Sequence, residues 1–394
     1  MLPAFHGSGR LVLALVFSLA ACTTESSQDA TQASDTWTDD DAPGPDSVQV
    51  AQEALKGLAE DGAYRAGYRE LEVTYTPTGQ EAPRTLVLGI WYPTNDTSGT
   101  PASYLGLLEQ DDVFADATLA PPPVAWKDSY RLHVHSHGHR GFAGATPYLM
   151  RHFATHGWIV AAPHHTGNTL VDNIEPRPPW MYVVRARDIT AVLDTLAALP
   201  EEDPLAGKVD TSEVLMSGHS FGGYTTYAVV GASFDPNQVE EVCAAGCSEG
   251  TLNLFESGVQ DPRVVAAIPM AAGNRSMFGD AGYGSIAVPL LMMTGDDDDS
   301  VKNEGQGDAI WGALNGKDAV RVDVAGGCHQ LFGLGACHKI DDDEGFRIVK
   351  VYTLAFAAQR LLGDQAMDPI LDGSVEVSDK VTLSQHYLVP ASMK

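Results

Sequence analysis

The sequence predicts an α/β fold built on a mostly parallel central sheet of about eight strands flanked by helices. Between residues 70 and 363, short apolar runs typical of strands alternate with segments of helical periodicity. The later runs are continuously apolar, as expected of strands that are buried on both faces of a parallel sheet. The spacing of these segments leaves no room for a second independent domain. We therefore expect one domain, with a C-terminal tail, over residues 66–394.

The individual elements follow from these runs. Eight runs are predicted strands: 70–76, 84–93, 131–137, 157–163, 213–218, 263–270, 288–295 and 319–326. Helical patterns are expected at 145–157, 181–199, 222–232, 307–316 and 345–363. In the second of these, Val184, Ile189, Val192 and Leu196 recur near one helical face, which is typical of a helix packed on a sheet.

The N-terminus has the pattern of a lipoprotein signal peptide over residues 1–21. Arg10 precedes an apolar run that is too short to span a bilayer, and the run ends in Leu-Ala-Ala-Cys, which resembles the bacterial lipobox. We expect Cys22 to be acylated, and Thr23 after it, in place of Asp, favours the outer membrane. The expected location is periplasmic or cell-surface, with the lipid as the sole membrane contact. An ordinary secreted protein is the alternative.

Residues 22–65 are expected to contain the acylated cysteine and a disordered acidic tether. The stretch from 23 to 47 is polar, acidic and nearly free of aliphatic side chains, so it cannot bury enough apolar surface to offset the entropy of ordering. The formal net charge of −28 argues against nucleic acid or an anionic membrane surface as a partner. The folded part should begin between residues 50 and 70.

Four cysteines remain if Cys22 carries lipid: Cys243, Cys247, Cys328 and Cys337. An even number in an exported protein suggests two disulfides, most simply between neighbours in the sequence. The sequence permits three pairings, and zinc binding by these thiols is the rival interpretation.

The motif Gly218-His219-Ser220-Phe221-Gly222 matches G-x-S-x-G between a predicted strand and a predicted helix. This setting is typical of a nucleophile elbow, in which a sharp turn strains the serine and small residues let neighbouring backbone pass close by. The N–H of Phe221, at the start of the helix, could then stabilise an oxyanion. Ser220 is the predicted nucleophile.

A serine nucleophile needs a general base and an acid that orients it. Downstream of Ser220 the histidines are His329, His338 and His386, and His329 alone follows the last predicted strand directly. We therefore expect His329 to be the base. Four consecutive aspartates, 296–299, follow the preceding strand, and their spacing does not choose among them.

Five segments together resemble the dienelactone-hydrolase-like α/β hydrolases, over roughly residues 66–363. They are HSHG, GWIVAAPHHTGNT, GHSFGG, TGDDDDSV and GGCHQLFG. That group includes platelet-activating-factor acetylhydrolases, and bacterial cutinases and polyester hydrolases are related to it. The resemblance implies an α/β-hydrolase fold without a large cap domain. Alignment of GDDDDSV with the cutinase pattern implies Asp299 as the acid, and the commoner hydrolase spacing implies Asp298.

The run from His133 to His139 has histidines at alternate positions, which raises the question of a metal site. A metallo-β-lactamase-type site needs an aspartate that is missing here, and alternate side chains of one strand do not converge on one ion. Residues 137–141 instead fit the H-G-x-x-G oxyanion loop. The resemblance implies the backbone N–H of His139 as the second oxyanion donor, with His165 possible beside the acyl subsite.

The sequence thus predicts a serine carboxylic-ester hydrolase that works through an acyl-enzyme and needs no cofactor. Its substrate would be a small ester, a lipid or a polyester. Polyester is in doubt because His137-Gly138-His139 and Phe221 replace the cutinase residues. A peptidase or acyltransferase would use the same triad. The alternatives from other classes are a metal-dependent hydrolase using the histidine run and a non-catalytic surface lipoprotein. Residues 233–262 are expected to form a disulfide-braced helical flap that borders the substrate cleft.

Overall fold

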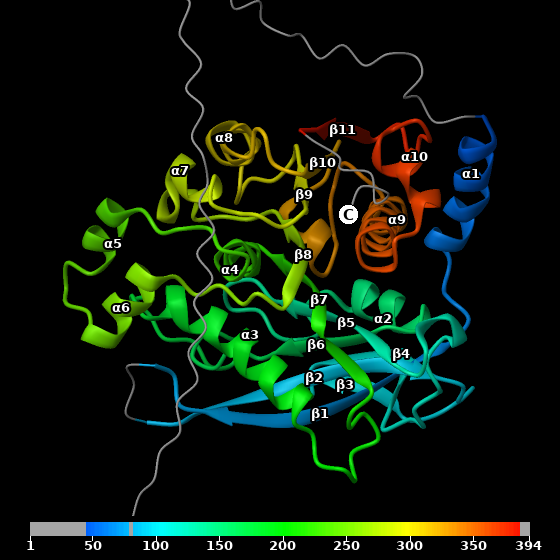
Figure 1. Ribbon diagram of the computed structural model, residues 1–394, viewed down its shortest axis with the longest axis horizontal. Coiled ribbons are helices and arrows are strands. Elements are labelled where there is room, and N and C mark those ends of the chain that lie inside the picture. Colours follow the sequence, from blue (N-terminus) through cyan, green and yellow to red (C-terminus); the bar gives the residue numbers. More distant parts are fainter. Residues whose placement is uncertain (1–44, 79–81, 387–394) are drawn as a thin grey trace, which may run out of the picture. The chain divides into compact units, whose positions relative to one another are not determined.

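The central element is an eleven-stranded sheet with the order β11-β10-β9-β8-β7-β5-β6-β2-β1-β4-β3 (Figure 1). The computed structural model describes residues 45–78 and 82–386. The expected signal peptide, the acylated Cys22 and the first half of the expected tether lie outside these residues. The strands are β1 (Arg65–Tyr75), β2 (Arg84–Thr94), β3 (Pro101–Tyr104), β4 (Leu108–Ala115), β5 (Tyr130–Ser136), β6 (Ile159–Pro163), β7 (Val209–His219), β8 (Val264–Met270), β9 (Leu290–Gly295), β10 (Ala319–Val324) and β11 (Val381–Gln385).

The α/β class is confirmed, and each of the eight predicted strands is present. The expected number of strands is wrong because β3, β4 and β11 extend the sheet at its two ends. β4 carries acidic side chains on a half-exposed strand, and β3 and β11 are only four and five residues long. Such short or polar edge strands lack the apolar run that identifies a buried strand.

The pairing is parallel from β6 to β10 in the middle of the sheet and mixed toward its ends, where β4 pairs parallel with β1 and antiparallel with β3. β5, β7, β8, β9 and β10 are parallel to their neighbours in this series. β1 pairs antiparallel with β2, β2 pairs antiparallel with β6, and β11 pairs antiparallel with β10. The carboxyl ends of the parallel strands therefore meet at one edge, which is where such sheets carry their sites.

Helices cover both faces of the sheet (Figure 1). One face carries α1 (Pro45–Ala59), α2 (Pro147–Thr155), α9 (Asp342–Leu362) and α10 (Asp368–Leu371). The other carries α3 (Met181–Ala197), α4 (Phe221–Val229), α5 (Pro236–Val242), α6 (Glu249–Ser257), α7 (Gly279–Tyr283) and α8 (Asp308–Ala313). Each of the five predicted helices has a counterpart, displaced by a few residues at its ends.

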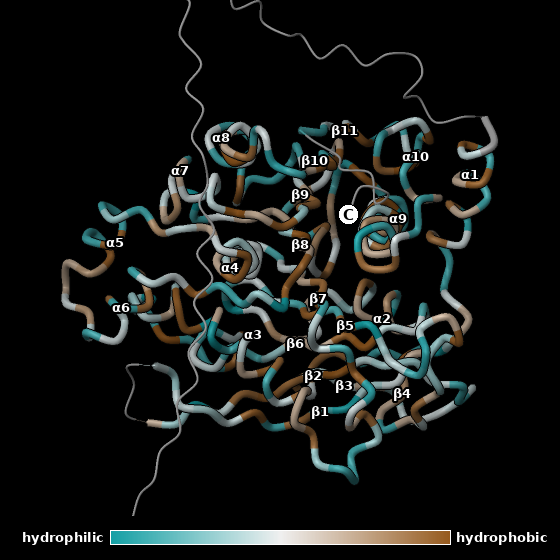
Figure 2. The backbone as a smooth tube through the Cα atoms, in the orientation of Figure 1, coloured by the Kyte–Doolittle hydropathy of each residue, from teal (hydrophilic) through white to brown (hydrophobic). Residues whose placement is uncertain are grey.

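Two buried clusters fill the space between these layers, and alternate strand residues point into each. Val320, Val322 and Val324 of β10 pack on the α9 side. Leu132 and Val134 of β5 pack on the α3 side. Figure 2 shows the resulting concentration of hydrophobic residues along the central strands. Full burial of one such side chain stabilises the fold by about 1.5–3 kcal/mol.

The predicted tether, residues 22–65, extends too far toward the C-terminus, because its second half contains a helix. Residues Pro45–Ala59 form helix α1, which contacts α9 and α10. Ala51 and Leu58 of this helix are buried in the cluster on that face. The helix was missed because the preceding residues are acidic and polar, although the apolar positions of α1 recur with a helical period.

Two disulfides join sequence neighbours, as predicted: Cys243–Cys247 and Cys328–Cys337. The first, hereafter the α5–α6 disulfide, lies between the two helices of the segment 233–262. The second lies in the loop after β10. Among the described residues, the helices are all too short or too polar to cross a membrane.

Candidate functional site

Four parallel strands end at one edge of the sheet, and each is followed by a segment that the sequence singles out. β5 precedes the loop 137–141, β7 precedes Ser220, β9 precedes the aspartate run, and β10 precedes His329. Residues that are far apart in the sequence are thereby brought to one end of the sheet.

Ser220 occupies a sharp turn between β7 and α4. Its backbone angles are φ 56° and ψ −117°, a region that costs a non-glycine residue about 1–3 kcal/mol. The turn is held by the Ser220 N–H, which donates to Met270 O on β8 at 2.9 Å. Ser220 itself is only half-buried, so its hydroxyl remains accessible at the N-terminus of α4.

The two glycines of the motif are required by close backbone packing. A Cβ at Gly222 would lie 1.8 Å from Ser136 O at the end of β5. A Cβ at Gly218 would lie 2.2 Å from Gly222 O. Both distances are far below contact, so any side chain would push α4 away from the sheet. The motif therefore sets the position of the turn as well as its conformation.

The imidazole of His329 is bound to a carboxylate. His329 begins the short helix η5 (His329–Phe332), and its Nδ1 donates to Asp298 Oδ2 at 2.7 Å. Asp298 is held in turn, because its Oδ1 accepts from Ser300 N at 2.8 Å and from Val301 N at 2.7 Å. Its side chain is 1% exposed. A buried carboxylate with these donors can fix both the tautomer and the orientation of the ring.

The expectation that Asp299 is this acid is wrong as to geometry. The Asp299 side chain is 97% exposed, and its nearest charged partner is Lys302 Nζ at 3.8 Å. The alternative, Asp298, is the residue that reaches His329. Two other members of the run, Asp296 and Asp297, bind Gly326 N and Lys339. Successive side chains of this turn point in different directions, so a shift of one residue moves the carboxylate out of the site.

His329 lies beside the nucleophile turn. Its ring centroid is 4.7 Å from that of His219, the residue before Ser220. Among the described residues, the Ser220 hydroxyl makes no hydrogen bond to His329, and such bonds often tighten only when substrate is bound. The other downstream histidines lie elsewhere: His338 is exposed, and His386 stacks on Trp311 at a centroid distance of 3.8 Å.

The loop 137–141 contacts the nucleophile turn from the β5 side. A Cβ at Gly138 would lie 3.2 Å from Ser220 Cβ, so the loop passes directly against the serine. A turn closes the loop, because Gly141 N donates to Gly138 O at 3.0 Å and Arg140 has φ 55°. Within the described part of the chain, the backbone N–H groups of His139 and Phe221 donate no hydrogen bond to another backbone group. Their predicted role as oxyanion donors stays a prediction.

A buried arginine that the sequence did not reveal holds this loop. Arg185 of α3 is fully buried, and its guanidinium donates to Ser136 Oγ at 3.0 Å and to the carbonyl of His137. It also donates to Asn168 Oδ1 at 2.7 Å. Asn168 Nδ2 then donates to His139 Nδ1 at 2.7 Å. A buried charge with several strong acceptors fixes their positions, so Arg185 is a positioning residue for the loop.

The same network continues to a second buried charge, Asp188, one turn further along α3. Asp188 accepts from Arg84 Nε at 2.7 Å, from Tyr75 Oη at 2.5 Å and from His165 Nδ1 at 2.8 Å. His165 Nε2 lies 2.9 Å from Ser136 Oγ, which closes the network. Burial and the nearby charge of Arg185 hold the pKa of His165 well below its ordinary value. His165 therefore belongs to the support of the loop, and nothing places it against an acyl group.

The four histidines of the run have separate partners. His133 Nε2 and His135 Nδ1 share the hydroxyl of Ser217, at 2.6 and 2.8 Å. Burial lowers the pKa of each of these two imidazoles to about 3. His137 Nδ1 donates to Gly138 O at 2.7 Å, and His139 Nε2 lies 3.1 Å from Glu175 Oε1. Over residues 45–78 and 82–386, no three His, Cys, Asp or Glu side chains are grouped as a metal ion requires.

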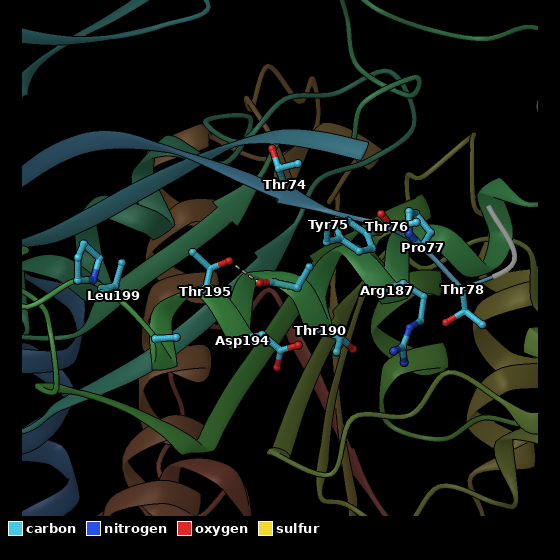
Figure 3. Close-up of a pocket in the computed structure, with 13 residues that line it drawn as sticks. Thr74, Tyr75, Thr76, Pro77, Thr78, Arg187, Thr190, Asp194, Thr195 and Leu199 are labelled. Carbon is cyan, nitrogen blue, oxygen red and sulfur yellow. Dashed lines mark hydrogen bonds between the residues drawn. The ribbon is translucent and has the colours of Figure 1, made fainter. Parts of the chain in front are cut away.

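A cavity of about 560 Å³ lies away from these residues (Figure 3). It is lined by the end of β1, including Thr74 and Tyr75, and by Thr190 and Asp194 of α3. Neither Ser220 nor His329 contributes to its wall. The candidate site thus lies at the ends of the central strands, and this cavity is a separate feature.

The segment 233–262 contains α5, α6 and their disulfide. Phe234 and Phe255 meet edge to face at 5.0 Å, and Phe234 packs on Phe278 at 5.4 Å. Phe278 stacks on Tyr224 of α4 at 4.8 Å. The segment is therefore joined to the helix that follows the nucleophile turn, and its predicted place at the border of a substrate cleft stays a prediction.

Searches of protein-family models and of curated proteins give no match to this chain. The fold and the site define an α/β protein with a strained serine, a histidine–aspartate pair and two backbone N–H groups gathered at one edge of a parallel sheet.

Proposed function

We propose that this chain is a serine carboxylic-ester hydrolase of the α/β-hydrolase type, similar to the dienelactone-hydrolase-like group. The observation that carries the proposal is the meeting of three elements at the carboxyl ends of parallel strands. These are Ser220 in a left-handed turn before α4, the loop 137–141 against that turn, and His329 bound to buried Asp298. This chain order of nucleophile, acid and base is the order of α/β hydrolases.

The proposed reaction begins with attack of Ser220 Oγ on the ester carbonyl carbon. His329 takes the hydroxyl proton at Nε2, and Asp298 stabilises the imidazolium through the bond to Nδ1. The N–H groups of His139 and Phe221 bind the carbonyl oxygen as it becomes negative. The C–O bond to the alcohol then breaks, and His329 returns the proton to the departing alkoxide. Water attacks the acyl-enzyme by the same route and releases the acid.

The substrate is proposed to be a small ester, a lipid or a polyester. Tyr182 is partly exposed beside the nucleophile turn and meets the buried Phe221 ring edge to face at 5.6 Å. An aromatic side chain at this place suits an apolar part of the substrate.

The test is the hydrolysis of p-nitrophenyl esters, from acetate to decanoate, by the wild-type protein and by Ser220→Ala, each with and without EDTA. We expect activity that survives EDTA and falls about 10⁶-fold in turnover in the variant, as when the nucleophile is removed from other triads. Activity that is kept in Ser220→Ala and lost to EDTA would replace this proposal with a metal-dependent hydrolase. Folded wild-type protein without any activity would support a non-catalytic scaffold.

Export and acylation complete the proposal. The signal pattern of residues 1–21 and the lipobox that ends at Cys22 support an outer-membrane lipoprotein. The mass of the N-terminal peptide from membrane fractions should equal that of residues from 22 onward with diacylglycerol and an acyl chain. An unmodified N-terminus at another residue would contradict it.

A further inference from the structure

Arg177 lies beside both proposed oxyanion donors. Its guanidinium carbon is 4.0 Å from the ring centroid of Phe221, the residue that follows the nucleophile. The Phe221 ring is itself fixed, because it is buried and stacked on Tyr224. Arg177 also contributes to the lowered pKa of the His139 imidazole, after burial, so its charge acts on the other donor residue. The arginine is thus packed on the wall of the candidate site.

The guanidinium of Arg177 forms no ion pair with a carboxylate of the described residues. In the described part of the chain it forms no ion pair, and its one hydrogen bond is from Nη1 to Tyr182 Oη at 3.5 Å. Its Nε is buried and has no acceptor. A buried donor without a partner carries a free-energy penalty that a bound acceptor removes.

Glu175, two residues away in the sequence, does not satisfy this donor, although, after the hydrogen bond from Asn173, the Arg177 charge contributes to lowering the pKa of its carboxyl. Glu175 is exposed, and its Oε1 is used by His139 Nε2 at 3.1 Å and by Asn173 Nδ2 at 2.9 Å. Glu175 thus holds the loop next to Arg177 and forms no ion pair with the guanidinium. Cation–π packing on Phe221 and the contact with Tyr182 hold the fork in place, so little side-chain entropy would be lost when it binds an anion.

We propose that Arg177 binds a carboxylate of the substrate, so that the preferred esters carry a carboxylate as well as the reacting ester group, as in a half-ester of a dicarboxylic acid. The planar fork of arginine matches a carboxylate with two parallel hydrogen bonds. This inference rests on the proposed ester hydrolysis at Ser220 and names its substrate class. Arg177 binds and orients the substrate and takes no part in bond breaking.

The test compares matched pairs of esters with the full-length chain. Monomethyl suberate and methyl octanoate differ by a carboxylate on the acyl side, and acetoxyhexanoate and hexyl acetate differ by one on the alcohol side. For each pair the readout is the ratio of kcat/KM for the carboxylate ester to that for the neutral ester. We expect Arg177→Gln to lower this ratio at least tenfold for one pair, chiefly through KM, and Arg177→Lys to lower it less.

Arg65→Gln is the matched control for loss of one positive charge. Arg65 is exposed at the start of β1, which is separated from β7 by β2, β6 and β5 in the sheet. The ratio should not change in this variant, and in wild type it should fall as salt is added. Equal loss of both kcat/KM values in Arg177→Gln would overturn the inference, because Arg177 would then only support Phe221.

A binding measurement separates this inference from the proposed function. Calorimetric titration of Ser220→Ala with monomethyl suberate and with acetoxyhexanoate needs no hydrolysis. We expect at least tenfold weaker binding of one of these anions when Arg177→Gln is added to that variant. If wild type hydrolyses none of the esters but the titration shows this loss, the esterase proposal fails and the anion site stands. If neutral esters are hydrolysed and neither anion binds through Arg177, the anion site fails alone.

Discussion

Substitution of Asp298 by asparagine tests the geometry of the proposed acid. The asparagine keeps the shape of the side chain and its oxygen can still accept from Ser300 N and Val301 N. Its amide NH₂ group would then face His329 Nδ1. In the wild type, His329 Nδ1 donates to the Asp298 carboxylate at 2.7 Å. The ring can accept a hydrogen bond from the amide only if its proton moves to Nε2. The nitrogen that should take the proton of Ser220 would then already carry one.

The expected loss follows from this change of tautomer. An aspartate-to-asparagine change in a serine triad lowers turnover about 10⁴-fold, which corresponds to about 5 kcal/mol of transition-state stabilisation. The assay is kcat for p-nitrophenyl butyrate, with the melting temperature measured to show that the variant is folded. Asp299→Asn is the matched control, because that side chain is 97% exposed and its Oδ1 lies 3.8 Å from Lys302 Nζ, away from His329. We expect its turnover to stay within about twofold of wild type, as for most surface substitutions.

Two results would refute this reasoning. A folded Asp298→Asn variant that retains more than a tenth of wild-type turnover would mean that the buried carboxylate does not orient the base. A large loss in Asp299→Asn with little change in Asp298→Asn would mean that the turn rearranges when substrate binds.

Three further predictions concern the support of the site. Arg185→Lys should lower kcat by about 10–100-fold and change KM less, since one ammonium cannot hold the three acceptors that Arg185 binds. A change in melting temperature without a change in kcat would contradict this. The pKa of His133 and of His135 is about 3 in the folded chain and about 6.5 when unfolded, so the stability they contribute is complete above pH 6.5 and falls as the pH drops from 6.5 toward 3. Urea unfolding should show a loss of about 2 kcal/mol per histidine at pH 5, reduced by about half in His135→Asn; a free energy of unfolding that is constant from pH 7 to 5 would contradict it. Removal of the Cys328–Cys337 disulfide by a double change to serine should cost about 2–3 kcal/mol of stability and also lower kcat, because Cys328 precedes His329. Loss of the α5–α6 disulfide should leave kcat unchanged. Equal effects of the two changes on kcat would mean that Cys328–Cys337 does not hold His329 in place.

The central strands and the sharp turn at residues 218–222 could be predicted from the sequence. Strands buried on both faces have a clear apolar pattern, and the G-x-S-x-G turn needs small residues that are visible in the sequence. The edge strands β3, β4 and β11 were missed, and so was helix α1, because their polar residues resemble those of loops. The disulfide pairing was predictable because its partners are close in the sequence.

The choice between Asp298 and Asp299 was not predictable, because four identical side chains follow β9 and only the path of the turn decides which reaches His329. The supporting network was also missed, although a signal for it exists. Arg185 and Asp188 lie at helical spacing between buried Met181 and Val192 on α3. Charged residues on the apolar face of a helix indicate a buried polar network, and their partners can be found only in three dimensions.

The central claim, that Ser220 is an activated nucleophile, is tested most directly by covalent labelling. The wild-type chain is treated with a fluorophosphonate and the modified residue is located by mass spectrometry of its peptides. We expect one adduct per chain, on Ser220, with no adduct in Ser220→Ala and slower labelling in Asp298→Asn than in Asp299→Asn. Folded wild-type chain that remains unlabelled, or that is labelled at another residue, would contradict it.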